Sequence, residues 1–356
     1  MEQHALNFQA DKIEMVLAAH KAHTRVVGGR LTPRTIQFHL APSPNTRLAK
    51  LESLTEEVAL ALGTPSARLT RTNGTLSIEV PRADSRFVSL LELDDRLQKD
   101  EHLRRALCSP GTAMLGIDGE GVPLLLRLSS PDVAHCLIAG TTGSGKTELA
   151  RTLIASLVMH QKPRDIQLAL FDPKGHGLSP FARAPHLLFS IVRDPEETLE
   201  RARYLVAEME RRDRDLIARP RVVIVIDELA DLLQTCGSEL EALLTRLVQR
   251  GRSAGFSLVA CTQKPSARVV GSLVKANFPV RLVGRVASTD DARVAAGIGG
   301  TGAEKLMGRG DFVLIAGGQT IRFQAAQVKP EEIAALFAPA VSEPRFSLMA
   351  KLRRVK

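Results

Sequence analysis

The chain has 356 residues, of which 44% are hydrophobic and 24% charged, so it is long enough for two or three domains with apolar cores of their own. No apolar run approaches the roughly 18 to 20 residues that a membrane-spanning helix needs, and the acidic N-terminus lacks the pattern of a secretory signal. We therefore expect a cytoplasmic protein without membrane insertion. The four cysteines show neither CxxC spacing nor nearby histidine pairs, which argues against a zinc site and a disulfide framework.

The net charge of +9 is compatible with an anionic partner, such as a nucleic acid or an anionic membrane. Aromatic residues make up only 4% of the chain, with one tyrosine and no tryptophan. Single-strand binding draws much of its energy from bases stacked on aromatic rings, so this composition disfavours it. Contacts with the phosphate backbone of a duplex fit the composition better.

The first part of the chain predicts a small α+β domain. We expect an N-terminal helical extension at residues 1–30, followed by the domain and a charged connecting helical region at residues 31–107. Asn73 and Gly74 lie between two alternating segments, which is a strong hairpin signal. The predicted elements are a helix at 12–23, a loop at 25–34, a strand at 35–42, a helix at 47–63, a hairpin at 67–80 and the helical region at 87–107.

Residues 108–338 alternate strands and helices as in a parallel α/β sheet, and we assign them to a second domain. One hairpin at 114–128 precedes this alternation and another at 312–324 follows it. A long charged helix is predicted at 194–218, and residues 339–356 form a basic C-terminal tail. The predicted parallel strands are 135–140, 166–172, 222–228, 256–262 and 280–286.

The stretch GTTGSGKT at residues 140–147 matches the complete P-loop pattern, with a predicted strand before it and a helix after it. In such a loop the backbone N–H groups converge on nucleotide phosphates, and the N-terminus of the helix adds partial positive charge. Lys146 is expected to reach the β- and γ-phosphates of ATP, and Thr147 to ligate Mg²⁺. The expected nucleotide-binding residues are Gly140, Thr141, Thr142, Gly143, Ser144, Gly145, Lys146, Thr147 and Asp227.

The buried strand VVIVI delivers Asp227 and Glu228 to its carboxyl end, where ligands of α/β sheets bind. We expect Asp227 to hold Mg²⁺ through water, and Glu228 to orient and deprotonate the attacking water. The alternative for this acidic pair is a cap on the following helix. Gln263 stands at the end of a neighbouring strand, where a polar residue can sense the γ-phosphate; on position alone, an ordinary hydrogen-bonded loop glutamine is the alternative.

The region around these residues contains, in this order, the segments FDPKGHGL, EMERRDRDL, VIVIDELADLL, LVQRGRSAGFSLVACTQKPS, LVKANFPVRLVGRV, DDAR and GAEKLMGRGDFVL. In order and spacing they resemble the motor domain of the FtsK/SpoIIIE family of DNA translocases. The segment at about 30–85 resembles the small α domain of that family, so the resemblance covers most of residues 25–330. It implies a RecA-like P-loop NTPase motor that forms a homohexameric ring around double-stranded DNA and couples ATP hydrolysis to translocation.

The resemblance also implies roles for individual residues. Lys146 and Thr147 match the family's Walker A pair, and Asp227 and Glu228 match its Walker B pair. Gln263 matches the sensor in the family's ATQ-like segment. These roles agree with those expected from the residues themselves.

A ring motor needs an arginine that acts in trans, because each ATP lies between subunits and the charge that develops on the γ-phosphoryl group must be offset. Arg293 in DDAR matches the family best, with Arg281 and Arg285 as the next candidates; for each, a surface salt bridge is the alternative. The candidate DNA contacts are basic residues in the loops after the sensor strand and before the last hairpin, namely Lys264, Arg268, Lys275, Lys305 and Arg309.

The best-known members of the family have N-terminal membrane-spanning helices and a C-terminal winged-helix domain, and neither is recognisable in this sequence. The same motor would serve the transfer of chromosome, plasmid or mobile-element DNA. One alternative is a coupling or secretion ATPase of related fold that moves single-stranded DNA or protein. Another is a DNA clamp that nucleotide only holds shut, although the presence of Glu228 beside Asp227 disfavours it.

Overall fold

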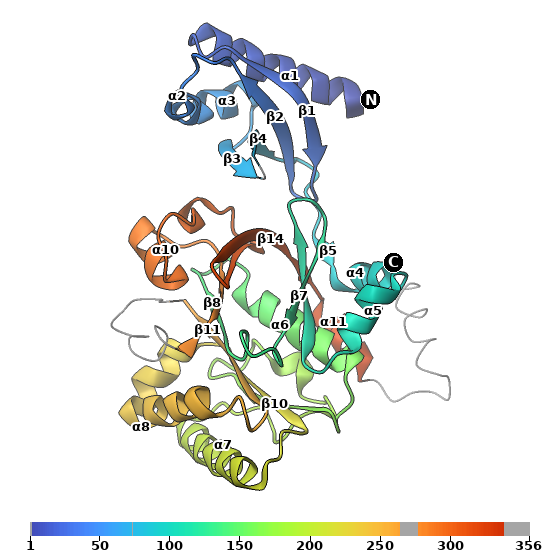
Figure 1. The fold of residues 1–356 in the computed structure, drawn as a ribbon, viewed down its shortest axis with the longest axis vertical. Coiled ribbons are helices and arrows are strands. Elements are labelled where there is room, and N and C mark those ends of the chain that lie inside the picture. The colour runs from blue at the N-terminus through green and yellow to red at the C-terminus, as the bar shows by residue number, and fades with distance from the viewer. Residues whose placement is uncertain (1, 73, 264–276, 338–356) are drawn as a thin grey trace. The chain divides into compact units, whose positions relative to one another are not determined.

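The computed structural model describes residues 2–72, 74–263 and 277–337 (Figure 1). The chain divides into two compact units, which separate between Phe87 and Val88. Within the part of the chain that is described, no helix is both long and apolar enough to cross a bilayer.

The first unit is an antiparallel four-stranded sheet in the order β1-β2-β4-β3, packed with three helices. Ile13 and Leu17 of the first helix are fully buried and share one apolar cluster with Phe38 and Ile78 of the sheet. The N-terminal helix is therefore part of this core, and our description of residues 1–30 as an extension is wrong. The elements are α1 (Glu2–Ala19), β1 (Thr24–Leu31), β2 (Thr35–Pro42), α2 (Leu48–Ser53), α3 (Thr55–Leu62), β3 (Arg68–Thr72) and β4 (Thr75–Pro81).

The segment that we predicted as a loop at 25–34 contains strand β1 instead. Its glycines serve the strand pairing, because a bulge between Val26 and Gly28 shifts the register against β2. A Cβ on Gly29 would lie 2.7 Å from the carbonyl oxygen of Gln37, so only glycine allows this close approach. The helix predicted at 47–63 is also broken into two at Leu54, and it ends at Gly63 with a φ of 65°, as predicted.

Residues 88–108 belong to the second unit, whereas we had grouped residues 31–107 with the first. They form β5 (Val88–Ser89), α4 (Leu90–Leu97) and α5 (Glu101–Cys108). Leu90, Leu93 and Leu97 lie on one face of α4 and are buried in the core of the second unit. That burial, together with the pairing of β5 with β14, ties the segment to the second sheet.

The second unit is built on a ten-stranded sheet whose main path runs β7-β6-β14-β13-β12-β8-β11-β10-β9. The five parallel strands that we predicted are present within it, in the order β12-β8-β11-β10-β9, and antiparallel strands extend the sheet beyond β12. The strands are β6 (Thr112–Asp118), β7 (Pro123–Arg127), β8 (Cys136–Ala139), β9 (Ile166–Phe171), β10 (Arg221–Ile226), β11 (Phe256–Thr262), β12 (Val280–Val283), β13 (Asp311–Ala316) and β14 (Gln319–Gln327). Both predicted hairpins, β6–β7 and β13–β14, are confirmed.

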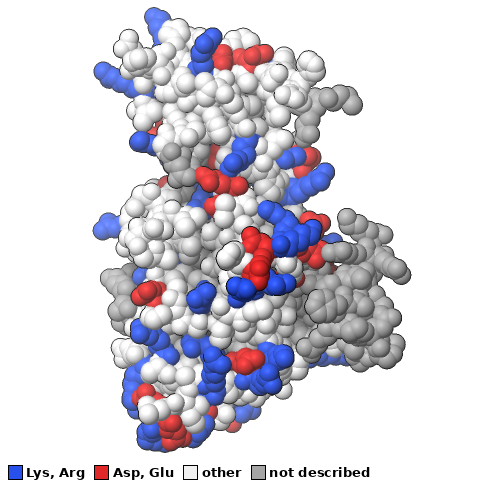
Figure 2. All heavy atoms as spheres, turned by 45° about the vertical axis from the view of Figure 1, so that its right-hand side comes forward, with Lys and Arg blue, Asp and Glu red and all other residues white. Residues whose placement is uncertain are grey.

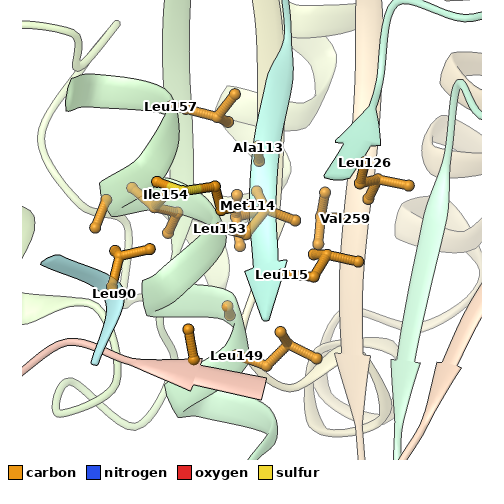
Figure 3. Close-up of a cluster of buried hydrophobic side chains, with 14 of the residues drawn as sticks. Leu90, Ala113, Met114, Leu115, Leu126, Leu149, Leu153, Ile154, Leu157 and Val259 are labelled. Carbon is orange, nitrogen blue, oxygen red and sulfur yellow. The ribbon is translucent and has the colours of Figure 1, made fainter. Parts of the chain in front are cut away.

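Helices cover both faces of this sheet. Helix α6 packs on one face, where its Leu149, Leu153 and Leu157 meet side chains of β6 and Val259 of β11 (Figure 3). Helices α7, α8 and α10 contribute to the apolar cluster on the other face. The helices are α6 (Lys146–His160), α7 (Pro195–Asp215), α8 (Leu229–Arg250), α10 (Thr289–Ala296) and α11 (Pro330–Leu336), with short 3₁₀ turns η1 (Ser179–Phe181) and η2 (Ala303–Lys305).

The surface of α7 and α8 carries charges of both signs. Arg203 pairs with Glu239 at 2.6 Å, and further ion pairs join the two helices along their length. Figure 2 shows Lys and Arg interleaved with Asp and Glu on the part of the second unit that these helices form. Arg203, Arg246 and Arg250 are therefore paired within the chain and add little to a positive field that would attract a polyanion.

Candidate active site

The loop at residues 140–147 joins β8 to α6 at the carboxyl edge of the parallel strands. Its start is fixed by two backbone hydrogen bonds, from the Gly140 N–H to the carbonyl of Thr262 in β11 at 3.2 Å and from the Thr141 N–H to the carbonyl of Arg285 after β12 at 2.8 Å. Gly145 has a φ of 101°, and a Cβ there would lie 2.8 Å from the backbone nitrogen of Gly310. The glycine is therefore required both by the backbone conformation and by this close contact.

Lys146 is the first residue of α6 and its side chain is buried within the loop. The ammonium group donates a hydrogen bond to the carbonyl oxygen of Thr141 at 3.1 Å. Burial lowers the pKa of Lys146, while the nearby acidic side chains oppose that effect. The cation is thus held over the loop, where the phosphates of a nucleotide would be bound.

Thr147 and Asp227 contact each other directly. The hydroxyl Oγ1 of Thr147 donates to Oδ1 of Asp227 at 2.9 Å, although the two residues come from α6 and from the end of β10. Burial raises the pKa of Asp227, and the hydrogen bond from Thr147 partly offsets this. Two hard oxygen ligands therefore meet beside the loop, which is the donor set that Mg²⁺ takes together with phosphates and water.

Glu228 precedes α8 and is only 2% exposed. Its Oε1 accepts a hydrogen bond from the backbone N–H of Gln263 at 3.1 Å, and burial raises the pKa of the carboxyl group above its usual range. The side chain makes no capping bond to α8, so the predicted alternative of an acidic helix cap does not apply to Glu228. A buried carboxylate of raised basicity at this edge has the properties of a general base.

Gln263 connects three strand ends. Its backbone binds Glu228, as described, and its side-chain oxygen accepts a hydrogen bond from Oγ1 of Thr142 at 3.0 Å. Because β11 lies between β8 and β10, the residue after β11 is in reach of both the P-loop and the acidic pair. Gln263 thus links the P-loop to Glu228 through hydrogen bonds, and its role as a sensor of the γ-phosphate stays a prediction.

The sequence reasoning gave no role to the loop after β9, which closes one side of the site. Asp172 is fully buried and accepts hydrogen bonds from the backbone N–H groups of Gly175 and Leu178 at 3.0 and 2.8 Å. Lys174 of this loop lies 3.6 Å from Oε2 of Glu228. The signal that could have revealed the loop is FDPKGHGL itself, an aspartate at the carboxyl end of a buried strand followed by spaced glycines.

The loop before β13 also braces the P-loop, a contact that we did not predict. The N–H of Arg309 donates to the Gly143 carbonyl at 2.9 Å, and the N–H of Gly310 donates to the Ser144 carbonyl at 2.8 Å. Arg309, a predicted DNA contact, thus has its backbone at the nucleotide loop. Lys305 is exposed in η2, while Lys264, Arg268 and Lys275 lie outside the described residues.

The three candidate arginines differ in their surroundings. Arg281 is 8% exposed, and its guanidinium donates to the carbonyl oxygens of Val294 and Ala295 at the end of α10. It is therefore committed within its own chain and is unsuited to reach a neighbour. Arg293 is exposed on α10, and Arg285 is exposed beside the P-loop, where its carbonyl binds Thr141.

The comparison with protein families matches both units. Residues 1–82 match the FtsK alpha domain, and residues 96–218 and 213–267 match the FtsK/SpoIIIE family. The chain belongs to the FtsK/SpoIIIE family. The predicted resemblance to this family and the predicted RecA-like P-loop fold are therefore confirmed.

Members of the FtsK/SpoIIIE family align with nearly the whole chain. The DNA translocase FtsK of Sporosarcina ureae is 31% identical over 94% of this chain and 46% of its own length. The DNA translocase SpoIIIE of Bacillus subtilis is 32% identical over 91% of this chain and 44% of its own length. The chain thus spans less than half the length of these curated relatives. Among solved structures, the monomer form of the pCW3 conjugation coupling protein TcpA with ATPγS has the same fold, with a TM-score of 0.61 at 18% identity over 92% of this chain and 99% of its own.

Proposed function

We propose that the second unit hydrolyses ATP and that the protein uses this reaction to move along double-stranded DNA as a homohexameric ring. The observation that carries the proposal is the position of Glu228, a buried carboxylate held by Gln263 at the P-loop edge of the sheet. The relatives named as DNA translocases support the choice of cargo. This activity would serve the transfer of chromosome, plasmid or mobile-element DNA. Because the reaction consumes ATP, we propose that the protein acts in the cytoplasm, where ATP is supplied.

ATP would bind at the loop of residues 140–147. Its backbone N–H groups and the start of α6 would hold the phosphates, and Lys146 would exchange its bond to Thr141 for the β- and γ-phosphate oxygens. Thr147 and Asp227 fit a magnesium ion, Thr147 directly and Asp227 through water, because both present oxygen ligands beside the loop. When bound, the ion supplies positive charge that neutralises the phosphates.

Hydrolysis would use Glu228 to orient the attacking water and to accept its proton. Gln263 would sense the γ-phosphate, since its side chain already contacts Thr142 of the P-loop. The segment that follows Gln263 in the sequence contains the candidate DNA contacts Lys264, Arg268 and Lys275. Phosphate contact by these residues, and by Lys305 and Arg309, would give binding that weakens steeply with salt.

A ring is proposed because the resemblance to the family places each ATP between subunits, where an arginine of the neighbour would offset the charge that develops on the γ-phosphoryl group. Arg293 of a neighbouring subunit is our candidate for that charge, since it is exposed on α10 and Arg281 is not available. Residues 88–338 would then be the motor, and residues 1–87 would correspond to the family's alpha domain.

The experiment is a steady-state ATPase assay with long duplex DNA, single-stranded DNA or an unfolded protein as added ligand. Duplex DNA should raise kcat most, and Glu228→Gln should remove turnover while leaving ATP and DNA binding intact. Glu331→Gln, an exposed glutamate of α11, is the matched control and should behave as the unmodified protein. Stimulation by single strands or by protein alone would instead favour a coupling or secretion ATPase.

A further inference from the structure

The loop at residues 172–178 is rigidly anchored to the catalytic edge. Asp172, the first residue of the loop, accepts hydrogen bonds from two of the loop's own N–H groups. Arg151 of α6 holds the loop from a neighbouring element. The guanidinium of Arg151 donates to the carbonyl oxygens of Gly177 at 2.6 Å and His176 at 2.9 Å. Because Arg151 lies one turn after Thr147, the loop is fixed to the same helix that begins at the P-loop.

This loop directs Lys174 to two carboxylates. The ammonium nitrogen of Lys174 lies 3.2 Å from Oδ2 of Asp231 and 3.6 Å from Oε2 of Glu228. Burial lowers the pKa of Lys174, but the hydrogen bond with Asp231 and the charge of Glu228 outweigh this and raise it. Lys174 therefore remains a cation at the site at neutral pH.

The two oxygens of Glu228 have different partners. Oε1 is held by the backbone N–H of Gln263, which cannot rotate away without moving the end of β11. Oε2 faces Lys174 at a distance longer than a normal hydrogen bond. The carboxylate is thus fixed at Oε1 by a hydrogen bond and oriented at Oε2 by electrostatic attraction. Oε2 retains lone pairs that can accept a proton from water.

We propose that Lys174 is a positioning residue for Glu228, and that Asp231 holds Lys174 in the place from which it acts. The proposal rests on the proposed function, because it assigns to Lys174 an effect on the base of that reaction. A fixed positive charge beside a buried carboxylate restricts its rotamer and aligns it for the attacking water. Lys174 would act through Glu228 and would make no contribution to holding the nucleotide.

An alternative use of Lys174 would be direct contact with the γ-phosphate. Its side chain is 47% exposed, so it could also reach a ligand. The two roles predict different kinetics, since a nucleotide contact sets the KM for ATP, whereas a positioning contact sets kcat.

The test measures kcat and KM for ATP, and the Kd for ATPγS, in the full chain with saturating duplex DNA. Lys174→Met should lower kcat on the order of 10- to 100-fold and change KM and Kd by less than about threefold. Lys174→Arg should restore most of kcat, because it keeps a cation facing both carboxylates. Lys162→Met, which replaces an exposed lysine after α6, is the control and should leave kcat, KM and Kd unchanged.

Lys174→Gln provides a second neutral variant should Lys174→Met fold poorly, with thermal unfolding as the check. An unchanged kcat in both neutral variants would overturn the proposal, as would a raised KM with an intact kcat, or a loss that Lys174→Arg does not repair. Glu228→Gln is measured alongside them. If it keeps full turnover, the assignment of the base has failed; if it is inactive while the Lys174 variants are normal, only the role of Lys174 has failed.

Discussion

Gly177 lies directly against the carboxylate of Asp227. A Cβ at position 177 would be 2.4 Å from Oδ2 and 2.8 Å from Cγ of Asp227, closer than atoms can approach without displacement. The loop after β9 and the strand end of β10 therefore fit together only because residue 177 has no side chain. This contact holds Asp227 on the side away from Thr147.

We predict that Gly177→Ala will weaken magnesium-dependent turnover. The added methyl group should push Asp227 or the loop out of place, so that kcat/KM falls on the order of 10-fold and more Mg²⁺ is needed for half-maximal rate. A magnesium titration of the ATPase rate measures this. Gly299→Ala is the matched control, because a Cβ at position 299 meets no atom within 4 Å. An unaltered magnesium requirement in Gly177→Ala would show that the contact with Asp227 is unimportant.

A variant that disturbs the loop containing Arg309 and Gly310 should show a different defect. Asp311 is buried and accepts hydrogen bonds from Nε of Arg322 and from the N–H of Met307 at 2.8 and 2.9 Å. Arg322→Met removes one partner and should loosen the neighbouring backbone bonds from Arg309 and Gly310 to the P-loop.

The expected result for Arg322→Met is a KM for ATP raised on the order of 10-fold with a smaller change in kcat, since the loop that binds phosphates would be less well ordered. Equilibrium binding of ATPγS should weaken in parallel. Arg164→Met, which replaces an exposed arginine of the same unit, should leave binding unchanged. A normal KM in Arg322→Met would mean that the brace does not organise the P-loop.

We predict that Arg293 is needed for hydrolysis and that Arg281 is needed for stability. Arg293→Ala is expected to stop hydrolysis while leaving nucleotide binding and stability intact, because its side chain is exposed. Arg281→Met is expected to lower the free energy of unfolding by about 1 to 3 kcal/mol, since it leaves the carbonyls at the end of α10 without their donor.

A mixing experiment tests whether Arg293 acts in trans. Arg293→Ala and Lys146→Ala subunits are inactive separately, but a mixed ring contains interfaces with an intact Lys146 on one side and an intact Arg293 on the other. Activity should reappear on mixing. Failure to recover any turnover from well-mixed rings would argue that Arg293 does not serve a neighbouring subunit.

His135 predicts a loss of stability in acid. Burial lowers its pKa from 6.5 to about 4, and its Nδ1 accepts a hydrogen bond from the N–H of Leu258, which requires the neutral ring. Above pH 6.5 the group is neutral in both states. As the pH falls from about 6.5 to about 4, only the unfolded chain gains the proton, so the free energy of unfolding falls by up to about 3 kcal/mol from this group. Urea denaturation at several pH values measures the slope, which should flatten in His135→Gln; an unchanged slope would contradict the prediction.

The sequence predicted the residues whose roles follow from local pattern. The P-loop is contiguous, and Asp227 and Glu228 end a strand so apolar that its burial was evident. The ends of adjacent parallel strands must meet at one edge, which also placed Gln263 beside them.

The contacts that the sequence did not reveal join segments far apart in the chain. The bonds from Arg309 and Gly310 to the P-loop, and the fit of Gly177 against Asp227, depend on how loops fold back over the strand ends. The glycines of β1 indicated a loop in the sequence. The bulge that needs them is visible only once β1 is paired with β2. For residues 88–108, the spacing of Leu90, Leu93 and Leu97 was a usable signal of an apolar helix face, but not of the sheet on which it packs.

Displacement of a triplex-forming strand tests the central account most directly. A third strand is bound to a long duplex, and its release is followed with the protein and ATP, with ATPγS, and with the Glu228→Gln variant. We predict release only with the unmodified protein and ATP, after a delay that grows with the distance between the protein's entry end and the triplex. Release without hydrolysis, or no release despite duplex-stimulated ATPase activity, would contradict the proposal that this protein moves along double-stranded DNA.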